Sequence, residues 1–452
     1  MQEIHARHAL TPAGWADDVR LTLSADGRIA DVVSGGPLSS PVDLLLPAPV
    51  NLHSHTFQRA MAGLTETRGP DPTDSFWTWR RLMFRFLERL DPDDVEAIAA
   101  MVYVEMLEAG YAAVAEFHYL HHAIGGVPYA DPAEMGGRIV AAAEATGIGL
   151  TLLPVLYMQG GCDGRALVGG QRRFGSDLDL YARMFEASAD MVRRADHGIG
   201  VAPHSLRAVP PHALHAAVGL APECPIHLHL AEQVAEVAEV EAHLGARPVT
   251  WLLDRAPVDA RWCLIHCTQM TATETLRLAE SGAIAGLCPI TESSLGDGIF
   301  PATTFAEAGG RFGVGSDSNI HVALWEELAT LEYSQRLRDR SRAALATRER
   351  STGRILFDAA LDAGAAAAGR RSGAVAVGHQ ADLVAISTAN EVLCEGRGDT
   401  LLDRLLVSGR ARACVTDVWS AGRHVVEGGR HRERDSVVAR YRSVMAGLRD
   451  AL

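Results

Sequence analysis

Short apolar runs rich in β-forming residues alternate through the middle of the chain with longer segments whose apolar residues recur at helical spacing. This alternation is typical of a parallel sheet whose strands are joined by crossover helices. The eight runs begin at Leu44, Tyr111, Ile148, Gly198, Cys224, Arg261, Gly282 and Arg311. Because eight parallel strands close into a barrel, the pattern predicts an α/β protein with a TIM-like (β/α)8 barrel.

Most of these runs start with apolar residues and end on His, Glu, Asp or Arg. Polar residues that merely terminate a strand would explain one or two such endings, but not a majority. Barrel enzymes place their catalytic residues at the carboxyl ends of the strands. The pattern therefore predicts an active site at that end of the barrel.

The two ends of the chain have a different pattern from the middle. Residues 1–47 and 375–430 contain short alternating runs broken by glycine-containing turns, which indicates strands. Neither flank is long enough to bury a core alone, so we expect both to form one small β-sandwich domain beside a catalytic barrel of residues 48–374. Residues 431–452 are predicted to form a terminal helix.

Composition removes several classes of protein. The 452 residues carry a formal net charge of -14 at pH 7, and this acidity disfavours nucleic-acid partners. No apolar stretch is long enough for a membrane span and no secretory signal opens the chain, so we expect a cytoplasmic protein. The seven cysteines, an odd number without a CxxC pair, fit reduced thiols. The absence of lysine excludes P-loop, Schiff-base and carbamylated-lysine chemistry.

Two H-x-H pairs occur, at His53/His55 and His227/His229. Side chains alternate in a strand, so both members of a pair point to the same face. His227 lies one layer deeper than His229, and we expect core packing for His227 and metal binding for His229. With Asp317, the ligand set His53, His55 and His229 suits one Zn²⁺ per chain, although Fe²⁺ is an alternative, and leaves a position for water.

Three further roles follow from this metal hypothesis. A bound divalent ion would make water nucleophilic near neutral pH, and Asp317 could both ligate the ion and accept the water's proton. Glu232 follows His229 by three residues, close enough to shuttle protons to a leaving group. His266, at the end of LIHCT, could stabilise the developing tetrahedral centre.

The motifs PVNLHSH, HLHLAEQ, LIHCTQM, GVGSDSN and the late GHQADLVAIS resemble the amidohydrolase superfamily over nearly the whole chain. The finer motifs HTFQRAMAG, FWTWR, EFHYLHH, HSLRAV and TESSLGDGIFP resemble its formimidoylglutamate deiminase family. That resemblance implies zinc-dependent hydrolysis of N-formimidoyl-L-glutamate to N-formyl-L-glutamate and ammonia in histidine degradation. It also implies a homodimer, and substrate contacts by Gln58, Arg80, Tyr119, His204 and Arg207.

Charge supports an anionic small-molecule substrate independently. A dicarboxylate approaching an acidic protein needs local positive charge, and arginine offers a planar bidentate fork for each carboxylate. Arg207 follows a predicted strand, whereas Arg80, with Arg81 competing for its role, lies in a long connection of residues 63–82 that we interpret as a lid. Simple packing of this Trp/Arg segment is the alternative, and the same holds for Gln58 and Tyr119 as ordinary hydrogen-bonding residues.

Other functions remain open at this point. The chief rival is a deaminase or chlorohydrolase acting on an aromatic aza-ring such as guanine or cytosine, for which ring stacking is expected. A barrel that serves only as a scaffold would have lost metal ligands, yet the full ligand set and Glu232 are present. A serine hydrolase is disfavoured because no G-x-S-x-G motif occurs.

Overall fold

The computed structural model of the chain describes residues 2–66 and 76–449. Within the first turns of the helix that begins at Phe76, the side chains of Trp79 and Arg80 are described and that of Arg81 is not. The connection predicted as a lid, residues 63–82, therefore lies partly outside the described residues.

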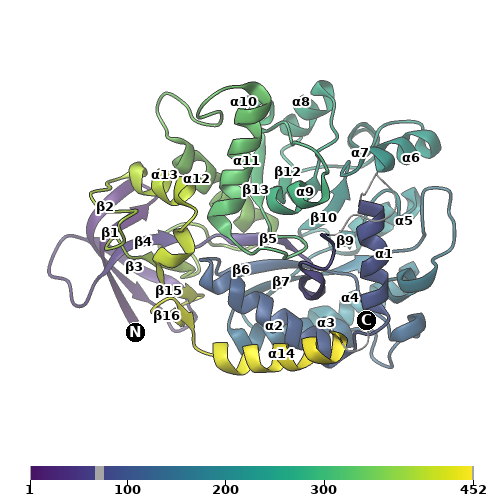
Figure 1. The fold of residues 1–452 in the computed structure, drawn as a ribbon, viewed down its shortest axis with the longest axis horizontal. Coiled ribbons are helices and arrows are strands. Elements are labelled where there is room, and N and C mark those ends of the chain that lie inside the picture. The colour runs from purple at the N-terminus through teal and green to yellow at the C-terminus, as the bar shows by residue number, and fades with distance from the viewer. Residues whose placement is uncertain (1, 67–75, 450–452) are drawn as a thin grey trace.

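The middle of the chain forms the predicted barrel (Figure 1). Its fourth strand is split into two short pieces, β8 and β9, which both pair with β7. The strands in chain order are β5 (Val50–Ser54), β6 (Ala113–His118), β7 (Gly149–Leu156), β8 (Gly198–Ile199) with β9 (Ala202–Pro203), β10 (Ile226–Leu230), β11 (Trp262–His266), β12 (Ile284–Leu287) and β13 (Arg311–Val314).

Parallel pairing closes the ring of strands. One continuous path runs from β5 to β8 and another from β10 to β13. Isolated bridges join the two paths, Val201 with Ile226 on one side and Ser54 with Asp317 on the other. Nearly every residue of these strands is buried, as expected of strands covered on both faces.

Helices surround the strands and connect their ends (Figure 1). The connection after β5 carries α1 (Phe76–Leu87) and α2 (Pro92–Glu108), and α2 begins with a capping box between Asp91 and Asp94. The other barrel helices are α3 (Glu134–Thr146), α4 (Leu178–Met191), α5 (Pro211–Leu220), α6 (Val234–Leu244), α7 (Pro248–Arg255), α8 (Ala272–Glu280), α9 (Pro289–Leu295), α10 (Ala302–Glu307), α11 (Leu324–Asp339) and α12 (Thr352–Ala367). Short 3-10 turns lie at Thr56–Met61, Ile124–Gly126, Gly169–Arg173 and Ala411–Cys414.

Both chain ends enter one eight-stranded sheet beside the barrel, in the order β17-β16-β15-β14-β4-β1-β2-β3. All eight strands are hydrogen-bonded into one continuous sheet. Residues from both chain ends share one apolar core in this domain, which includes Leu21, Leu45 and Leu383. The strands are β1 (Gln2–Thr11), β2 (Gly14–Leu23), β3 (Ile29–Ser34), β4 (Val42–Pro47), β14 (Leu383–Ile386), β15 (Val415–Ser420), β16 (Arg423–Glu427) and β17 (Arg430–His431).

Residues 375–430 contain a helix in addition to the predicted strands. Asp399–Ser408 forms the helix α13, whose leucines Leu401, Leu402 and Leu405 are buried in the main core. The spacing of these leucines is helical, so a period of about 3.6 residues overrides the strand pattern here. We retain boundaries near residues 47 and 375 as a proposal, supported by the end of β4 at Pro47 immediately before β5.

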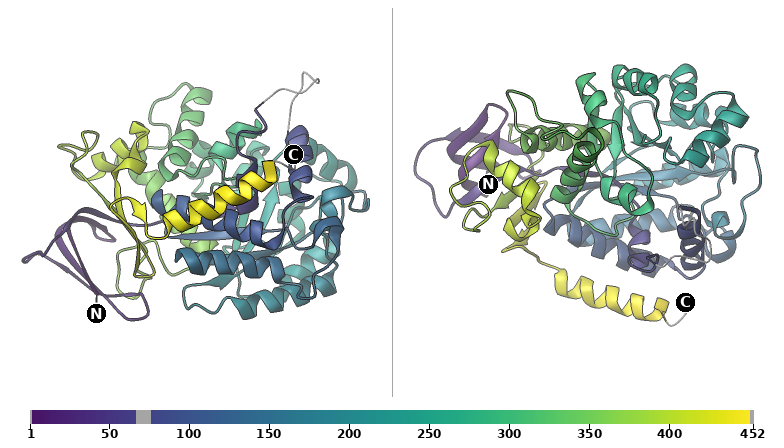
Figure 2. Two further views of the ribbon diagram at one scale, coloured as in Figure 1. Left: turned by 60° about the horizontal axis from the view of Figure 1, so that its bottom comes forward. Right: turned by 45° about the horizontal axis from the view of Figure 1, so that its top comes forward.

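The last described helix, α14 (Arg434–Arg449), runs along the outside of the barrel, as Figure 2 shows. It lies against α2, where Arg440 Nη1 is 2.6 Å from Glu96 Oε1 and Arg434 forms an ion pair with the buried Glu108. Of all the helices that the structure describes, none has the length and apolar character of a membrane span.

Candidate active site

Three imidazoles meet at the carboxyl end of the barrel. The Nε2 atom of His53 lies 3.2 Å from Nε2 of His55 and 3.1 Å from Nε2 of His229. His53 belongs to β5, His55 directly follows it, and His229 belongs to β10. All three side chains are buried. The same-face rule for H-x-H therefore places His53 and His55 together, and the closure of the barrel brings His229 to them.

The outer ring nitrogens orient two of these imidazoles. Nδ1 of His55 donates to the Phe117 carbonyl oxygen at 2.8 Å, and Nδ1 of His229 donates to the His204 carbonyl oxygen at 3.1 Å. Because a carbonyl oxygen can only accept, the proton is on Nδ1 and the Nε2 lone pair faces the cluster. Burial lowers the pKa of His55 to about 3, so this ring is neutral at physiological pH.

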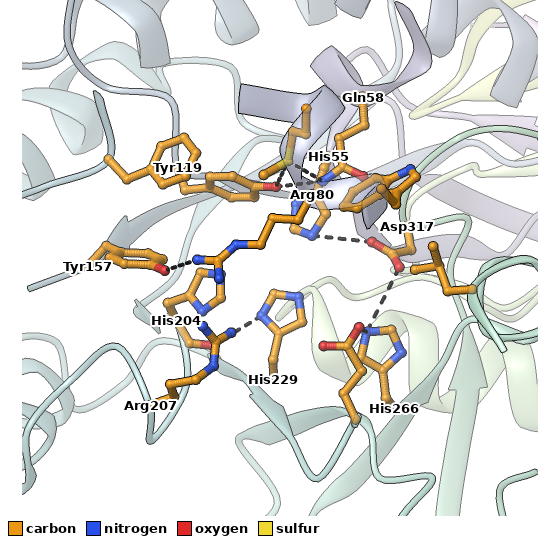
Figure 3. Close-up of a pocket in the computed structure, with 15 residues that line it drawn as sticks. His55, Gln58, Arg80, Tyr119, Tyr157, His204, Arg207, His229, His266 and Asp317 are labelled. Atoms are coloured by element: carbon orange, nitrogen blue, oxygen red, sulfur yellow. Dashed lines mark hydrogen bonds and ion pairs between the residues drawn. The ribbon is translucent and has the colours of Figure 1, made fainter. Parts of the chain in front are cut away.

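Asp317 places a carboxylate oxygen beside this cluster. Its Oδ1 atom is 3.2 Å from His55 Nε2 and 3.7 Å from His53 Nε2 (Figure 3). Burial raises the pKa of Asp317 to about 7, against the lowering effect of nearby His266. A carboxyl with such a pKa can take up or release a proton near neutrality, as a general base requires.

The backbone around Asp317 is held in a strained form. Its φ is 45°, in the left-handed region that costs a non-glycine residue energy. Asn319 Nδ2 fixes this turn by donating to the Asp317 carbonyl at 2.9 Å and to Ser54 Oγ at 3.1 Å. A Cβ at Gly315 would come within 2.6 Å of the His53 backbone, so glycine is required where the end of β13 passes β5.

The donor set fits a divalent cation. Three neutral nitrogens whose lone pairs face one another repel unless a positive charge lies among them, and a carboxylate beside them completes a set typical of zinc. Among the described residues, a second group of possible ligands comprises His266, Cys288 and Asp317. The imidazole trio fits a cation better, because His266 is engaged by a carboxylate on its other side.

That carboxylate belongs to Glu292 on α9. Glu292 Oε1 lies 3.1 Å from His266 Nδ1, while His266 Nε2 is 3.9 Å from Asp317 Oδ2 and 4.0 Å from Glu232 Oε1. Burial acts to lower the pKa of His266, but the charges of Glu232, Glu292 and Asp317 outweigh it and raise the pKa to about 10. A protonated ring donates from both nitrogens and can stabilise developing negative charge.

Glu232 lies in the turn after β10 and its side chain lines the pocket. The buried carboxylate of Glu236, on α6, accepts from the Glu232 backbone N–H at 2.9 Å and from the Ala231 N–H at 3.2 Å. Ala231 has φ 51°, so this turn also adopts a left-handed residue. Glu236 therefore stabilises the backbone that carries Glu232.

His55, His229 and Asp317 line a pocket with about 540 Å³ of empty space, part of it open to solvent. On one wall Gln58 Nε2 donates to Tyr119 Oη at 2.5 Å, and the Tyr119 hydroxyl faces Met83 Sδ at 3.7 Å. The full lining comprises His55, Gln58, Trp79, Arg80, Met83, Tyr119, Tyr157, Phe174, His204, Arg207, His229, Glu232, His266, Leu295 and Asp317.

Two arginines from distant elements supply positive charge to this pocket. Arg80 comes from α1 and Arg207 from the loop after β9, and Tyr157 lies against Arg80, with Arg80 Nη2 donating to its hydroxyl at 3.1 Å. Figure 3 shows both guanidiniums on the same side of the pocket as His204. Burial lowers the pKa of Arg80, and the charge of Arg207 lowers it further. Two neighbouring cations that line one pocket favour an anionic ligand.

The structure brings the predicted site residues to one place. The imidazole cluster holds His53, and the pocket wall holds His55, Gln58, Arg80, Tyr119, His204, Arg207, His229, Glu232, His266 and Asp317. His227 is separate, because its Nε2 donates to the Ala367 carbonyl at 2.8 Å inside the barrel, consistent with the core packing predicted for it.

Sequence reasoning assigned no role to three polar residues in and around the pocket: Tyr157, Glu236 and Glu292. Tyr157 directly follows β7, so the strand-end rule could have found it. Glu292 lies in the motif TESSLGDGIFP, but its contact with His266 depends on how α9 packs. Glu236 contacts the backbone of Glu232 four positions earlier, in the capping box that begins α6, so a local signal existed for it.

Comparison with protein-family models matches residues 44–425 to the amidohydrolase family. The chain belongs to this family. Residues 1–40 of this amidohydrolase match the model of the N-terminal domain of formimidoylglutamate deiminase HutF. The chain is 47% identical to the formimidoylglutamate deiminase of Pseudomonas aeruginosa, with 100% of both chains covered. It is 27% identical to the 8-oxoguanine deaminase of the same species, over 94% of this chain and 93% of that protein.

Solved structures have the same fold. A crystal structure of an amidohydrolase from Brucella melitensis superposes with a TM-score of 0.95 at 48% identity, covering 99% of this amidohydrolase and 100% of that chain. A zinc-bound adenosine deaminase from Xanthomonas campestris gives a TM-score of 0.82 at 23% identity, covering 99% and 98%. The second likeness concerns the fold alone. These matches confirm the barrel with its end-sheet domain.

Proposed function

We propose that this amidohydrolase hydrolyses N-formimidoyl-L-glutamate to N-formyl-L-glutamate and ammonia, a step of histidine degradation. The observation that carries the proposal is the placement of two arginines and a metal-fitting imidazole cluster in one pocket. The full-length similarity to the formimidoylglutamate deiminase of Pseudomonas aeruginosa supports the same reaction. The substrate is an anionic amidine, so it needs both cationic anchoring and hydrolytic machinery.

One divalent ion is held by His53, His55, His229 and Asp317 in this proposal. Members of the family are metal-dependent, and the nitrogen-rich donor set favours Zn²⁺, with Fe²⁺ as the alternative. When bound, such an ion supplies Lewis acidity and makes water nucleophilic near neutral pH. The buried rings that hold it are already oriented by Phe117 and His204 carbonyls.

The pocket walls orient the substrate. Arg80 and Arg207 receive its carboxylates. Gln58, Tyr119 and His204 line the same pocket, with Tyr119 and His204 against rings of the imidazole cluster, and would hold the formimidoyl group. Bidentate arginine contacts fix the direction of a flexible dicarboxylate as well as its charge. They therefore bring the electrophilic carbon to the base of the pocket in a reactive orientation.

Proton transfers are assigned to the carboxyls and to His266. Asp317 accepts a proton from the attacking water, whose oxygen forms a bond to the formimidoyl carbon. Protonated His266 stabilises the resulting tetrahedral centre. Glu232 takes the hydroxyl proton of that centre and delivers it to the terminal nitrogen, so that the bond between this nitrogen and the carbon breaks as the formyl C=O bond forms. Ammonia leaves, the nitrogen on the glutamate side stays bound to the new formyl group, and Asp317 returns its proton to the departing ammonia or to solvent.

A deaminase of aromatic aza-rings is the alternative. The similarity to 8-oxoguanine deaminase and the presence of Trp79 and Phe174 in the pocket lining are compatible with a ring substrate. Two arginines that line one pocket suit an anionic substrate better than a neutral base, because each guanidinium can bind a carboxylate through two hydrogen bonds.

A cytoplasmic location, a homodimeric assembly and the absence of nucleic-acid or membrane partners stay predictions.

The test is a steady-state assay of ammonia release from N-formimidoyl-L-glutamate, with cytosine, guanine and 8-oxoguanine as comparison substrates. Elemental analysis of the same preparation measures the bound metal. We expect equimolar ammonia and N-formyl-L-glutamate and no release from the bases. Turnover of a base in preference to the amidine would overturn the proposal.

A further inference from the structure

Tyr157 lines the pocket but has no role in the proposed reaction. The residue directly follows β7, its side chain is almost fully buried, and it lines the pocket beside Arg80, Arg207 and His204. The Tyr157 and His204 rings are 4.6 Å apart between centroids, so the phenol is fixed against a wall of the substrate site. Figure 3 shows its hydroxyl facing the Arg80 guanidinium.

The hydrogen bonds of Tyr157 have a defined direction. Arg80 Nη2 donates to its oxygen at 3.1 Å, and a guanidinium has no acceptor atom. Gln171 Nε2 donates to the same oxygen at 3.3 Å. The backbone N–H of Val168 donates to Gln171 Oε1 at 3.3 Å, which orients the amide nitrogen toward Tyr157.

A phenol oxygen accepts two hydrogen bonds and donates one. Because Arg80 and Gln171 use both acceptor positions of Tyr157, its own proton has to go to a further acceptor. Arg207 is a third donor beside this oxygen. Within the described part of the chain, the recorded hydrogen-bond partners of the Tyr157 hydroxyl are therefore donors, and no acceptor for its proton is recorded there. A buried hydroxyl proton in a pocket between two cations is suited to an anionic oxygen that enters with the ligand.

The charges around Tyr157 also favour an anionic partner for its hydroxyl. Burial acts to raise the pKa of the Tyr157 hydroxyl, but the charges of Arg207 and Arg80 outweigh it and place the pKa below its ordinary value. A more acidic hydroxyl is a stronger hydrogen-bond donor, and a bond to a carboxylate is charge-assisted.

We propose that Tyr157 binds one substrate carboxylate directly, donating its hydroxyl proton to a carboxylate oxygen held between Arg80 and Arg207. Tyr157 is then a specificity-determining residue for the dicarboxylate, and Gln171 is the residue that directs its proton into the pocket. This assignment rests on the proposed function, because it identifies the ligand anion as one of the two carboxylates of the substrate.

The experiment compares wild type and Tyr157→Phe on N-formimidoyl-L-glutamate and on two analogues, each lacking a different one of its two carboxylates. We expect the KM for the dicarboxylate to rise about 10- to 100-fold in the variant, the effect of one hydrogen bond to a charged group, with kcat much less affected. The loss should persist for the analogue that keeps the contacted carboxylate and disappear for the other. Metal content should be unchanged.

Two further variants separate this role from a structural one. Tyr181→Phe is the matched control, because Tyr181 is also a buried phenol, bonded to the Pro154 carbonyl at 3.2 Å, but does not line the pocket. It should leave KM unaffected. Gln171→Glu places an acceptor beside Tyr157 that captures its proton, and it should reproduce the substrate-selective loss even if Tyr157→Phe folds poorly.

The outcomes are distinct. Equal losses on all three substrates, or none, would overturn the role of Tyr157 while leaving the proposed function intact. Failure of the wild-type enzyme to turn over N-formimidoyl-L-glutamate would overturn the proposed function, and the carboxylate assignment with it. A loss confined to the dicarboxylate and one analogue supports both and identifies which carboxylate Tyr157 binds.

Discussion

Glu236 holds Glu232 in place through the backbone: its Oε2 accepts from the Glu232 N–H at 2.9 Å, while its Oε1 accepts from the Ala231 N–H at 3.2 Å. The left-handed φ of 51° at Ala231 makes this turn unfavourable without such support. Glu236 is therefore a positioning residue, four positions after the residue that it orients.

Glu236→Gln is expected to lower kcat by about 10-fold with little change in KM, because the amide nitrogen would face a backbone N–H and displace Glu232 slightly. Glu241→Gln is the control, since Glu241 is exposed near the end of the same helix. Steady-state kinetics measures kcat and KM, and thermal unfolding measures the stability, of both variants. A parallel loss of kcat and stability in the two variants would contradict a positioning role.

Glu232→Gln should retain its metal and lose catalysis by about 10²-fold or more, because the variant keeps the shape of the side chain but cannot transfer a proton. Turnover and elemental analysis are measured on the same preparation. Near-normal kcat would remove Glu232 from proton transfer.

His55→Ala should abolish both bound metal and turnover, because it removes one of the clustered nitrogens. His227→Ala is the matched control from the other H-x-H pair, since His227 bonds the Ala367 carbonyl away from the cluster. It should retain metal with reduced stability. Elemental analysis measures the bound metal in both variants. Full metal content in His55→Ala would reject the ligand assignment.

Arg207→Met should raise KM about 10- to 100-fold and change kcat less, because a charged hydrogen bond to the substrate is lost while the length of the side chain is kept. Arg165→Met serves as control, because Arg165 pairs with Asp163 near the surface and does not line the pocket. Unchanged kinetics in Arg207→Met would place the substrate elsewhere.

Asp196 joins the barrel to the end sheet, with Arg423 Nη2 at 2.6 Å and Arg194 Nη2 at 2.9 Å. Burial acts to raise the pKa of Asp196, but the two arginines outweigh it and hold the pKa below the ordinary value of 3.8. A depressed carboxyl pKa contributes stability that is fully present above the unfolded-state value and is lost as pH falls through the folded-state value.

Asp196→Asn should therefore lower the free energy of unfolding by about 2 kcal/mol at pH 7, a value reduced from that of a fully buried pair because Arg423 is partly exposed. The difference from wild type should shrink as pH falls below about 4. Denaturant unfolding at several pH values measures it. A difference that is constant down to pH 2 would contradict the ion-pair explanation.

Much of this protein could be predicted from its sequence because the signals are local. The alternating runs indicate eight strands, and the period of two residues places His53 and His55 on one face. Most strand ends were recognisable by a polar residue, so His229, His266 and Asp317 could be selected without coordinates. Two elements were less clear: the fourth strand is split, and Asp399–Ser408 is a helix among predicted strands.

The sequence by itself determined which residue types stand at each strand end, since strand periodicity depends only on neighbouring positions. Only the tertiary structure decided which of them meet and how they are oriented. The left-handed backbone at His266 and Asp317 lies among contacts with residues far away in the chain, such as Glu292 and Ser54. The contact of Glu292 with His266 and the direction of the Tyr157 proton also depend on packing between helices and strands, which no local pattern encodes.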